Sequence, residues 1–273
     1  MMKRLTTLLL LLIGTVGGAC AYENTYAVIV GVADYKNFVP GDGDLNYTVS
    51  DAISFASFLK SKKGGNVPAS NIVLLTDAQA TKDNIIAKAK ALFAKAKKDD
   101  RVIFYFSGHG SKGCFLPYDA GDIGNNLLYF NEVKSIFRSA KCNTKLLFAD
   151  ACFAGSMKRG LANNSELKKS IEKNLKKSLK STSNMNIAVM MSCQGDETSM
   201  EMGSLKQGLF TYYLMEGLGG QANSDGNKYV TIQELYYYLY HKVKNKAAQC
   251  NPPHKQTPEL FGKFDLRLIV AKV

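Results

Sequence analysis

The sequence predicts an α/β protein with a mostly parallel central sheet and helices on both faces. Five short apolar runs predict buried strands, at residues 25–32, 72–75, 102–106, 145–149 and 187–191. Helical periodicity occupies other segments, at residues 50–60, 81–97, 132–137, 207–218 and 231–247. Strands that are apolar on both faces and alternate with helices are typical of a three-layer arrangement.

Each element rests on its own pattern. Strand runs such as TYAVIVGV and VIFYF contain no charged residue. Within residues 50–60, the apolar positions 53, 56, 58 and 59 follow helical spacing, and within residues 81–97 positions 85, 86, 89, 92 and 93 do the same. The predicted strands are uninterrupted apolar runs, whereas in the predicted helices the apolar residues recur every three or four positions.

The first 21 residues have the organisation of a secretory signal peptide. Lys3 and Arg4 precede an apolar run at residues 5–13, and a small-residue cleavage site, Ala19-Cys20-Ala21, follows it. The apolar run is too short to cross a bilayer. We therefore expect cleavage after Ala21.

Such cleavage would export the protein to the periplasm, the cell surface or the medium. Lipidation of Cys20 is the weaker alternative, because Gly17 stands where a lipoprotein signal usually has a larger apolar residue. No later segment is long and apolar enough to cross a membrane. We expect residues 22–273 to form one domain and the mature protein to be a monomer.

The formal net charge of +12 falls to +10 when Lys3 and Arg4 leave with the signal peptide. Much of the excess positive charge lies in the Lys-rich residues 157–183. The chain has no zinc-finger spacing, no aromatic–basic binding motif and no helix-turn-helix pattern. A solvated basic face accounts for the charge better than a nucleic-acid partner does. We therefore expect that the protein does not bind nucleic acid.

A histidine and a cysteine each follow a predicted strand, His109 after residues 102–106 and Cys152 after residues 145–149. Parallel strands end at one edge of a sheet, where α/β proteins bind their ligands. A thiol attacks a carbonyl well only when a nearby base takes its proton, and imidazole titrates in the suitable range. Singly, each residue has a structural explanation. Together they favour a catalytic pair, with the Gly110 and Cys152 backbone N–H groups as an oxyanion hole.

A series of segments resembles, in order, the caspase/metacaspase-like cysteine peptidases. They are YAVIVGVADY (26–35), LNYTVSDA (45–52), YFSGHG (105–110), DACFAGS (150–156), SCQGDETSME (192–201), GLFTYYLMEGL (208–218), DGNKYVTIQEL (225–235) and QTPELFGKFD (256–265). The resemblance implies the three-layer caspase-like fold and cysteine endopeptidase activity. It also implies that His109 is the general acid–base and Cys152 the nucleophile.

The resemblance further implies a specificity pocket (S1) for the residue before the scissile bond (P1). Metacaspase-like members hold a basic P1 side chain with acidic residues, and Asp51 and Asp150 match two of those positions. The segment 192–201 resembles the loop that lines the substrate cleft, which adds Ser192 and Cys193. Because paired carboxylates attract Arg or Lys and repel Asp, we expect a peptide or protein substrate with a basic P1 residue. Asp51 as a helix N-terminal acid and Asp150 as a strand-end acceptor are the structural alternatives.

Two positions depart from the metacaspase pattern. Phe153 replaces the His that often follows the nucleophile, and Thr48 stands where many metacaspases carry a second Cys. Three other functions therefore stay open. The chain could be a clostripain- or legumain-like peptidase with a different P1 preference, a catalytically silent caspase-like scaffold, or a basic surface- or nucleic-acid-binding protein.

Residues 157–185 form a basic insert within the predicted domain, where the family often carries a cleavable linker. A pocket for Arg or Lys beside it suggests self-cleavage after Lys158, Arg159 or a later Lys. The competing interpretation is an amphipathic helix that covers the cleft or an anionic surface, because Leu167, Ile171, Leu175 and Leu179 recur every four residues.

No metal or cofactor site is assigned from the sequence. The chain has three His and no CxxC pair, which argues against structural zinc. Some metacaspase-like enzymes require Ca²⁺, but Asp225-Gly226-Asn227 is too short to match an EF-hand. Five cysteines remain after cleavage of the signal peptide, enough for two disulfides and one reactive thiol.

Overall fold

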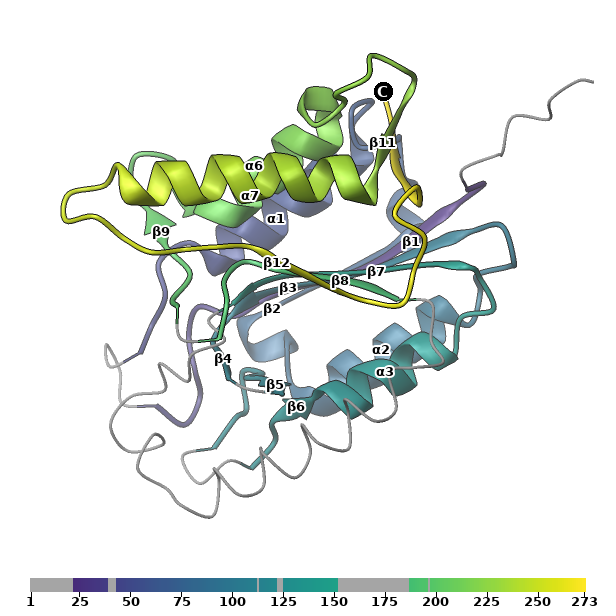
Figure 1. Cartoon of the computed structure of the whole chain (residues 1–273). Helices are drawn as coiled ribbons and strands as arrows, with labels where there is room; N and C mark the ends of the chain where they lie inside the picture. The colour runs from purple at the N-terminus through teal and green to yellow at the C-terminus, as the bar shows by residue number, and fades with distance from the viewer. Residues whose placement is uncertain (1–21, 39–42, 112, 122–124, 152–186, 196) are drawn as a thin grey trace, which may run out of the picture.

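The computed structural model describes residues 22–38, 43–111, 113–121, 125–151, 187–195 and 197–273. A six-stranded sheet with the order β12-β8-β7-β3-β1-β2 forms its centre (Figure 1). Its strands are β1 (Thr25–Gly31), β2 (Ile72–Thr76), β3 (Arg101–Gly108), β7 (Thr144–Ala151), β8 (Ala188–Met191) and β12 (Glu259–Gly262). All neighbouring strands pair in parallel except β12, which runs antiparallel to β8. The predicted mostly parallel sheet is confirmed.

Helices cover both faces of this sheet. One face carries α2 (Lys82–Phe93) and α3 (Phe130–Arg138), and the other carries α1 (Thr48–Lys60), α6 (Leu209–Glu216) and α7 (Ile232–Ala248) (Figure 1). The three-layer prediction is therefore confirmed. Each of the five predicted strands also has its counterpart, in β1, β2, β3, β7 and β8.

Several short strands were not predicted, because a segment of two to four residues is too short to show a periodic pattern. They are β4 (Gly110–Ser111), β5 (Cys114–Phe115), β6 (Leu128–Tyr129), β9 (Glu201–Met202), β10 (Gln207–Gly208), β11 (Tyr229–Thr231) and β13 (Ile269–Lys272).

Two apolar cores lie on opposite faces of the sheet, and β3 contributes to both. Phe104 and Phe106 belong to the core beneath α2 and α3, whereas Ile103 and Tyr105 belong to the core beneath α1, α6 and α7. Successive side chains of a strand point to opposite faces, so a fully buried central strand must be apolar at every position. This requirement explains the uninterrupted apolar run from which β3 was predicted.

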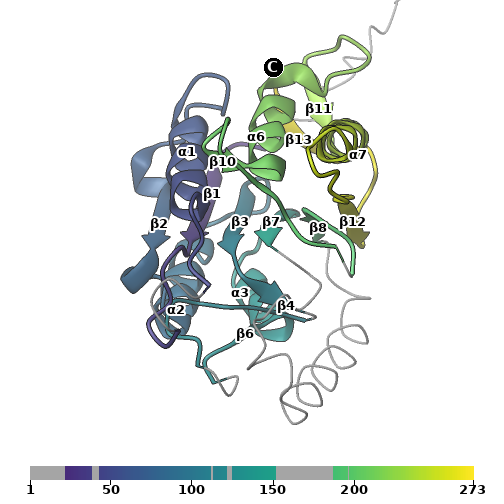
Figure 2. The same ribbon diagram turned by 90° about the vertical axis from the view of Figure 1, so that its left-hand side faces the viewer.

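The register of the parallel strands aligns their carboxyl ends. Ser107 pairs with Gly31 of β1 on one side and with Asp150 of β7 on the other, and Gly108 pairs with Ala151. Figure 2 views the molecule from this edge, with the strand arrowheads toward the viewer. The chain therefore leaves β3 toward His109 at the same edge where β7 ends.

Several sequence predictions fall outside the described residues: the signal peptide at 1–21, the nucleophile Cys152 and the basic insert at 157–185. Of the cysteines that are described, Cys114, Cys142 and Cys250 are free thiols.

Candidate active site

A small pocket opens at the carboxyl edge of the sheet. It lies where β3, β7, α1 and the segment around β9 and β10 meet, on the face seen in Figure 2. Its lining is Leu45, Thr48, Asp51, Ser107, Gly108, His109, Asp150, Ser199, Met200, Glu201 and Gly208. Three of the sequence-predicted site residues, Asp51, His109 and Asp150, thus border one space.

Asp51 reaches the pocket from the first turn of α1. The start of this helix is tied to the end of β1, because the Thr48 hydroxyl donates to the Val32 carbonyl at 2.7 Å. The Asp51 carboxyl is 1% exposed and accepts hydrogen bonds from the Ser107 hydroxyl and the Gly208 N–H, both at 2.9 Å. Burial, reinforced by the negative charge of Asp150, raises the pKa of Asp51 to about 8.

Asp150 reaches the pocket from β7 and accepts three hydrogen bonds. The Thr211 N–H and hydroxyl donate to its Oδ2 at 3.0 and 2.8 Å, and the Ser199 hydroxyl donates to its Oδ1. Burial raises the pKa of Asp150, while these donors lower it. Burial also raises the pKa of Tyr105 well above its usual range, so its hydroxyl stays protonated and donates to Thr211 Oγ1 at 2.5 Å.

Gly208 separates the two carboxyl groups. A Cβ atom at this position would lie 2.2 Å from Asp150 Oδ2 and 2.8 Å from Asp51 Oδ2, far inside van der Waals contact. Its φ of −63° is open to any residue, so it is the close approach of the carboxylates that requires glycine here. The two acids therefore face one another across a backbone that has no side chain.

His109 follows β3 and is held at two points. The Tyr35 hydroxyl accepts a hydrogen bond from the His109 backbone N–H at 2.7 Å, and Nε2 of the ring lies 2.6 Å from the Gly43 carbonyl oxygen. Because a carbonyl only accepts, Nε2 carries the proton of the neutral ring and Nδ1 is its proton acceptor. The Tyr35 ring, with its centroid 5.0 Å from that of the imidazole, packs against one side.

The strand register brings the chain segments of the predicted pair together. Gly108 and Ala151 are pairing partners on neighbouring parallel strands, and His109 and Cys152 are the next residues in each. Gly110, a predicted oxyanion donor, begins β4 and pairs with Phe115. Cys152 lies outside the described residues, so the dyad and its oxyanion hole stay predictions.

Ser192 and Cys193 are placed differently from the two aspartates. Both are fully buried and neither lines the pocket. The Ser192 hydroxyl bonds the Ala151 N–H and carbonyl, both at 3.1 Å, and Cys193 Sγ lies 3.6 Å from the same carbonyl. The two side chains therefore brace the backbone that leads to Cys152, and their assignment to S1 stays a prediction.

Glu201 is a pocket residue that the sequence analysis did not identify. It accepts hydrogen bonds from the Tyr47 N–H at 2.6 Å and the Asn46 N–H at 3.0 Å, which fixes the chain just before α1. Its charge also raises the pKa values of Asp51 and Asp150. Glu201 begins β9, 150 residues from Asp51 in the sequence, and no periodic pattern singles it out within the matched segment 192–201.

Ser107, by contrast, could have been found from the sequence. It precedes Gly108 and His109 at the end of a predicted central strand, where a polar side chain is unexpected unless it faces the site.

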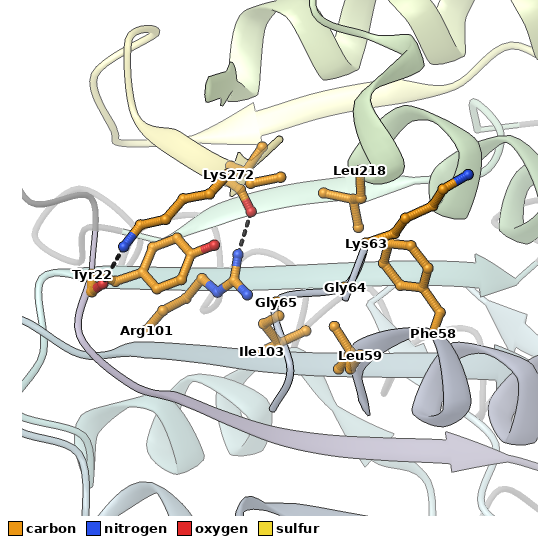
Figure 3. Close-up of a pocket in the computed structure, with 12 residues that line it drawn as sticks. Tyr22, Phe58, Leu59, Lys63, Gly64, Gly65, Arg101, Ile103, Leu218 and Lys272 are labelled. Atoms are coloured by element: carbon orange, nitrogen blue, oxygen red, sulfur yellow. Dashed lines mark hydrogen bonds between the residues drawn. The ribbon is translucent and has the colours of Figure 1, made fainter. Parts of the chain in front are cut away.

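A second pocket lies at the opposite edge, near the start of β3 (Figure 3). The Arg101 guanidinium stacks on Tyr22 with 3.8 Å to the ring centroid and donates to Thr25 and to the Val270 carbonyl. Lys272 donates to the Tyr22 carbonyl at 3.2 Å, while Lys63 points away from Arg101 (Figure 3). Arg101 and Lys272 thus bind the Tyr22 ring and carbonyl, the Thr25 hydroxyl and the Val270 carbonyl, so this pocket anchors the chain around Tyr22.

Within the described ranges, no three His, Cys, Asp or Glu side chains are grouped so that they could bind a metal ion. The same residues include no helix that is both long and apolar enough to span a membrane.

Comparison with known proteins decides the family. The sequence profile described as the caspase domain matches residues 24–267. The chain belongs to the caspase-domain family. The resemblance drawn from its motifs is thereby confirmed.

Three relatives share parts of this sequence. A probable protease from a Desulfuromonadales bacterium is 29% identical over 150 residues, covering 46% of this chain and 18% of that protein. Metacaspase-1A of Aspergillus oryzae is 30% identical over 109 residues, covering 38% and 25%. Metacaspase-1 of Yarrowia lipolytica is 27% identical over 169 residues, covering 52% and 35%. The matches thus span about a fifth to a third of the relatives' own lengths.

Solved structures share the fold. A protein from Geobacter sulfurreducens aligns with a TM-score of 0.62 at 16% identity, over 90% of this chain and 97% of that one. Caspase-1 from Spodoptera frugiperda aligns with a TM-score of 0.61 at 13% identity, over 91% and 89%. The caspase-like architecture is therefore shown for nearly the whole chain.

Gly208→Ala tests whether the two carboxylates depend on the bare backbone between them. The new methyl group collides with Asp150 and Asp51, and overpacking of this kind costs about 1–3 kcal/mol. We expect the midpoint of thermal unfolding to fall by several degrees. Gly195→Ala is the matched control, because nothing lies within 4 Å of its added Cβ. Equal melting temperatures for the two variants would show that the carboxylates do not crowd Gly208.

Proposed function

We propose that this protein is a cysteine endopeptidase that hydrolyses peptide bonds after Arg or Lys. The observation that carries the proposal is the pair of buried carboxylates, Asp51 and Asp150, in the pocket that also contains His109. Membership in the caspase-domain family supports the peptidase class, and the protease name of one relative agrees with it.

The electrostatics of the pocket support a basic P1 residue. Asp51, Asp150 and Glu201 line it, and within its described lining no Lys or Arg offsets their charge. Burying two carboxylates without a counter-ion is unfavourable, as the raised pKa values of Asp51 and Asp150 express. An arginine or lysine side chain supplies the missing positive charge, whereas an aspartate would add a further buried negative charge.

The proposed chemistry assigns each group a step. His109 Nδ1 takes the proton of the Cys152 thiol, and the thiolate attacks the scissile carbonyl carbon. The Gly110 and Cys152 N–H groups stabilise the resulting oxyanion. The imidazolium then gives its proton to the leaving amine, which breaks the C–N bond and leaves an acyl-enzyme. Water, deprotonated by the same imidazole, then attacks the acyl carbon; the C–S bond breaks, the carboxylic acid product leaves and the Cys152 thiol is restored.

The hydrogen bond from Nε2 to the Gly43 carbonyl supports this role for His109. It fixes the tautomer with Nδ1 as the acceptor and stabilises the imidazolium that forms when the thiol is deprotonated. Gly43 belongs to the segment before α1, the helix that carries Asp51.

Two further elements complete the proposal. The signal peptide at residues 1–21 would export the enzyme, and the basic insert at residues 157–185 would supply Lys and Arg bonds that match the pocket. The enzyme would then be able to process itself, either within one molecule or between two.

Fluorogenic peptides with Arg, Lys, Asp or Asn at P1 test the specificity. We expect cleavage after Arg and Lys that disappears in Cys152→Ala. Asp51→Asn and Asp150→Asn should each lower kcat/KM for the Arg peptide by about 100-fold, because each leaves a buried cation with half its counter-charge.

Asp83→Asn is the control, because this exposed acid of α2 lies on the opposite face of the sheet. Preferential cleavage after Asn or Asp would contradict the basic-P1 assignment. A folded wild type that cleaves none of the four peptides, with or without Ca²⁺, would instead favour a non-catalytic scaffold.

Self-processing is tested by the intact masses of purified wild type and Cys152→Ala after incubation under conditions in which the peptide is cleaved. We expect wild type to break at a Lys or Arg between residues 157 and 185, and the variant to stay intact. Identical masses would rule out self-processing, while fragments from Cys152→Ala mixed with wild type would indicate cleavage between molecules.

A further inference from the structure

The segment that leads into β12 runs beside the loop that walls the pocket. Gln256, in this segment, is 1% exposed, and its side-chain amide makes three hydrogen bonds. Oε1 accepts from the Met200 N–H at 3.0 Å, and Nε2 donates to the Ser192 carbonyl and to Ser199 Oγ, both at 3.2 Å. One glutamine from the C-terminal part of the chain thus binds Ser192, Ser199 and Met200, which lie between β8 and β9.

The orientation of this amide follows from its neighbours. A backbone N–H can only donate, so the atom that faces Met200 must be the oxygen. A carbonyl can only accept, so the atom that faces Ser192 must be the nitrogen. The second N–H of the same nitrogen is then directed at Ser199 Oγ.

The direction of the next hydrogen bond follows in turn. Ser199 Oγ accepts from Gln256, and its hydroxyl proton is donated to Asp150 Oδ1. Hydrogen bonds in series polarise one another, and a donor to a carboxylate favours its ionised form. Gln256 therefore reaches Asp150 through one hydroxyl group without touching it.

We infer that Gln256 is a positioning residue for the specificity pocket, which through Ser199 holds Asp150 in place to bind a basic P1 side chain. This inference rests on the proposed function, because it concerns the partner that a P1 cation would meet. Gln256 acts on substrate binding and leaves the chemistry at His109 unchanged. The C-terminal segment, remote in sequence from the catalytic motifs, thereby becomes part of the specificity apparatus.

The backbone at Gln256 is anchored independently of its own amide. The next residue, Thr257, donates from its N–H and hydroxyl to Glu197 at 2.6 and 3.1 Å. Lys255, on the other side, lies 3.3 Å from the same carboxylate. Substitution of the Gln256 side chain should therefore leave the segment in position.

A double-mutant cycle tests the inference, with Gln256→Met, Ser199→Ala and the combined variant. The readouts are KM and kcat for the Arg peptide and the inhibition constant of benzamidine, a small cation that needs only the pocket. Each single substitution should raise KM and the inhibition constant about 10-fold, the effect of one hydrogen bond to a charged group. The double variant should lose no more than either single one, because both interrupt one chain of bonds.

Three outcomes would overturn the inference: wild-type inhibition constants in Gln256→Met, additive losses in the double variant, or a fall in kcat with KM unchanged. Ser199→Thr, which restores the hydroxyl, should recover benzamidine binding. Gln249→Met, an exposed glutamine at the end of α7, is the control and should match wild type. If Gln256→Met does not fold, Gln256→Glu keeps an acceptor for Met200, removes both donors and should show the same loss.

The failure of this inference is distinguishable from the failure of the proposed function. If wild type cleaves after Arg and binds benzamidine while Gln256→Met behaves identically, only the positioning role of Gln256 is wrong. If wild type neither cleaves after a basic residue nor binds benzamidine, both the proposed specificity and the positioning role of Gln256 are wrong.

Discussion

The burial of two aspartates side by side constrains the whole carboxyl edge of the sheet. A buried carboxylate is tolerated only with hydrogen-bond donors around it, and the donors here come from β3, α6, β10 and the loop before β9. Elements that are distant in sequence must therefore converge on Asp51 and Asp150. The absence of a side chain at Gly208 allows the two acids to approach so closely.

The two acids accept different numbers of hydrogen bonds, and this difference decides which of them carries the negative charge. Asp150 accepts three hydrogen bonds and Asp51 accepts two, so the negative charge is better supported on Asp150. Near neutral pH, Asp51 therefore keeps a proton, in agreement with its pKa of about 8 and with the contribution of the Asp150 charge to that value. The free pocket holds one negative charge in this pair, and a bound cation would favour the second.

The sequence predicted the helices and strands with a clear apolar pattern and the residues that directly follow a strand. Uninterrupted apolar runs identify the central strands, and parallel pairing then brings His109 and the segment after Ala151 to one edge. Asp51 and Asp150 came from family resemblance. Glu201 and Gln256 were not singled out within their matched segments, because their hydrogen-bond partners are far away in the sequence and neither segment has a periodic pattern. Ser192 and Cys193 match the expected loop, yet side-chain direction depends on packing, and both turn toward β7.

The most direct test of the carboxylate pair is the number of protons released when benzamidine binds, measured by titration calorimetry in buffers of different ionisation enthalpy. In the free protein Asp51 is protonated below pH about 8. An amidinium favours the ionised form and lowers that pKa, so binding at pH 7 should release about one proton, and affinity should rise as the pH approaches 8. Asp51→Asn should release none. Equal heats in all buffers for wild type at pH 7 would contradict a shared proton in this pocket.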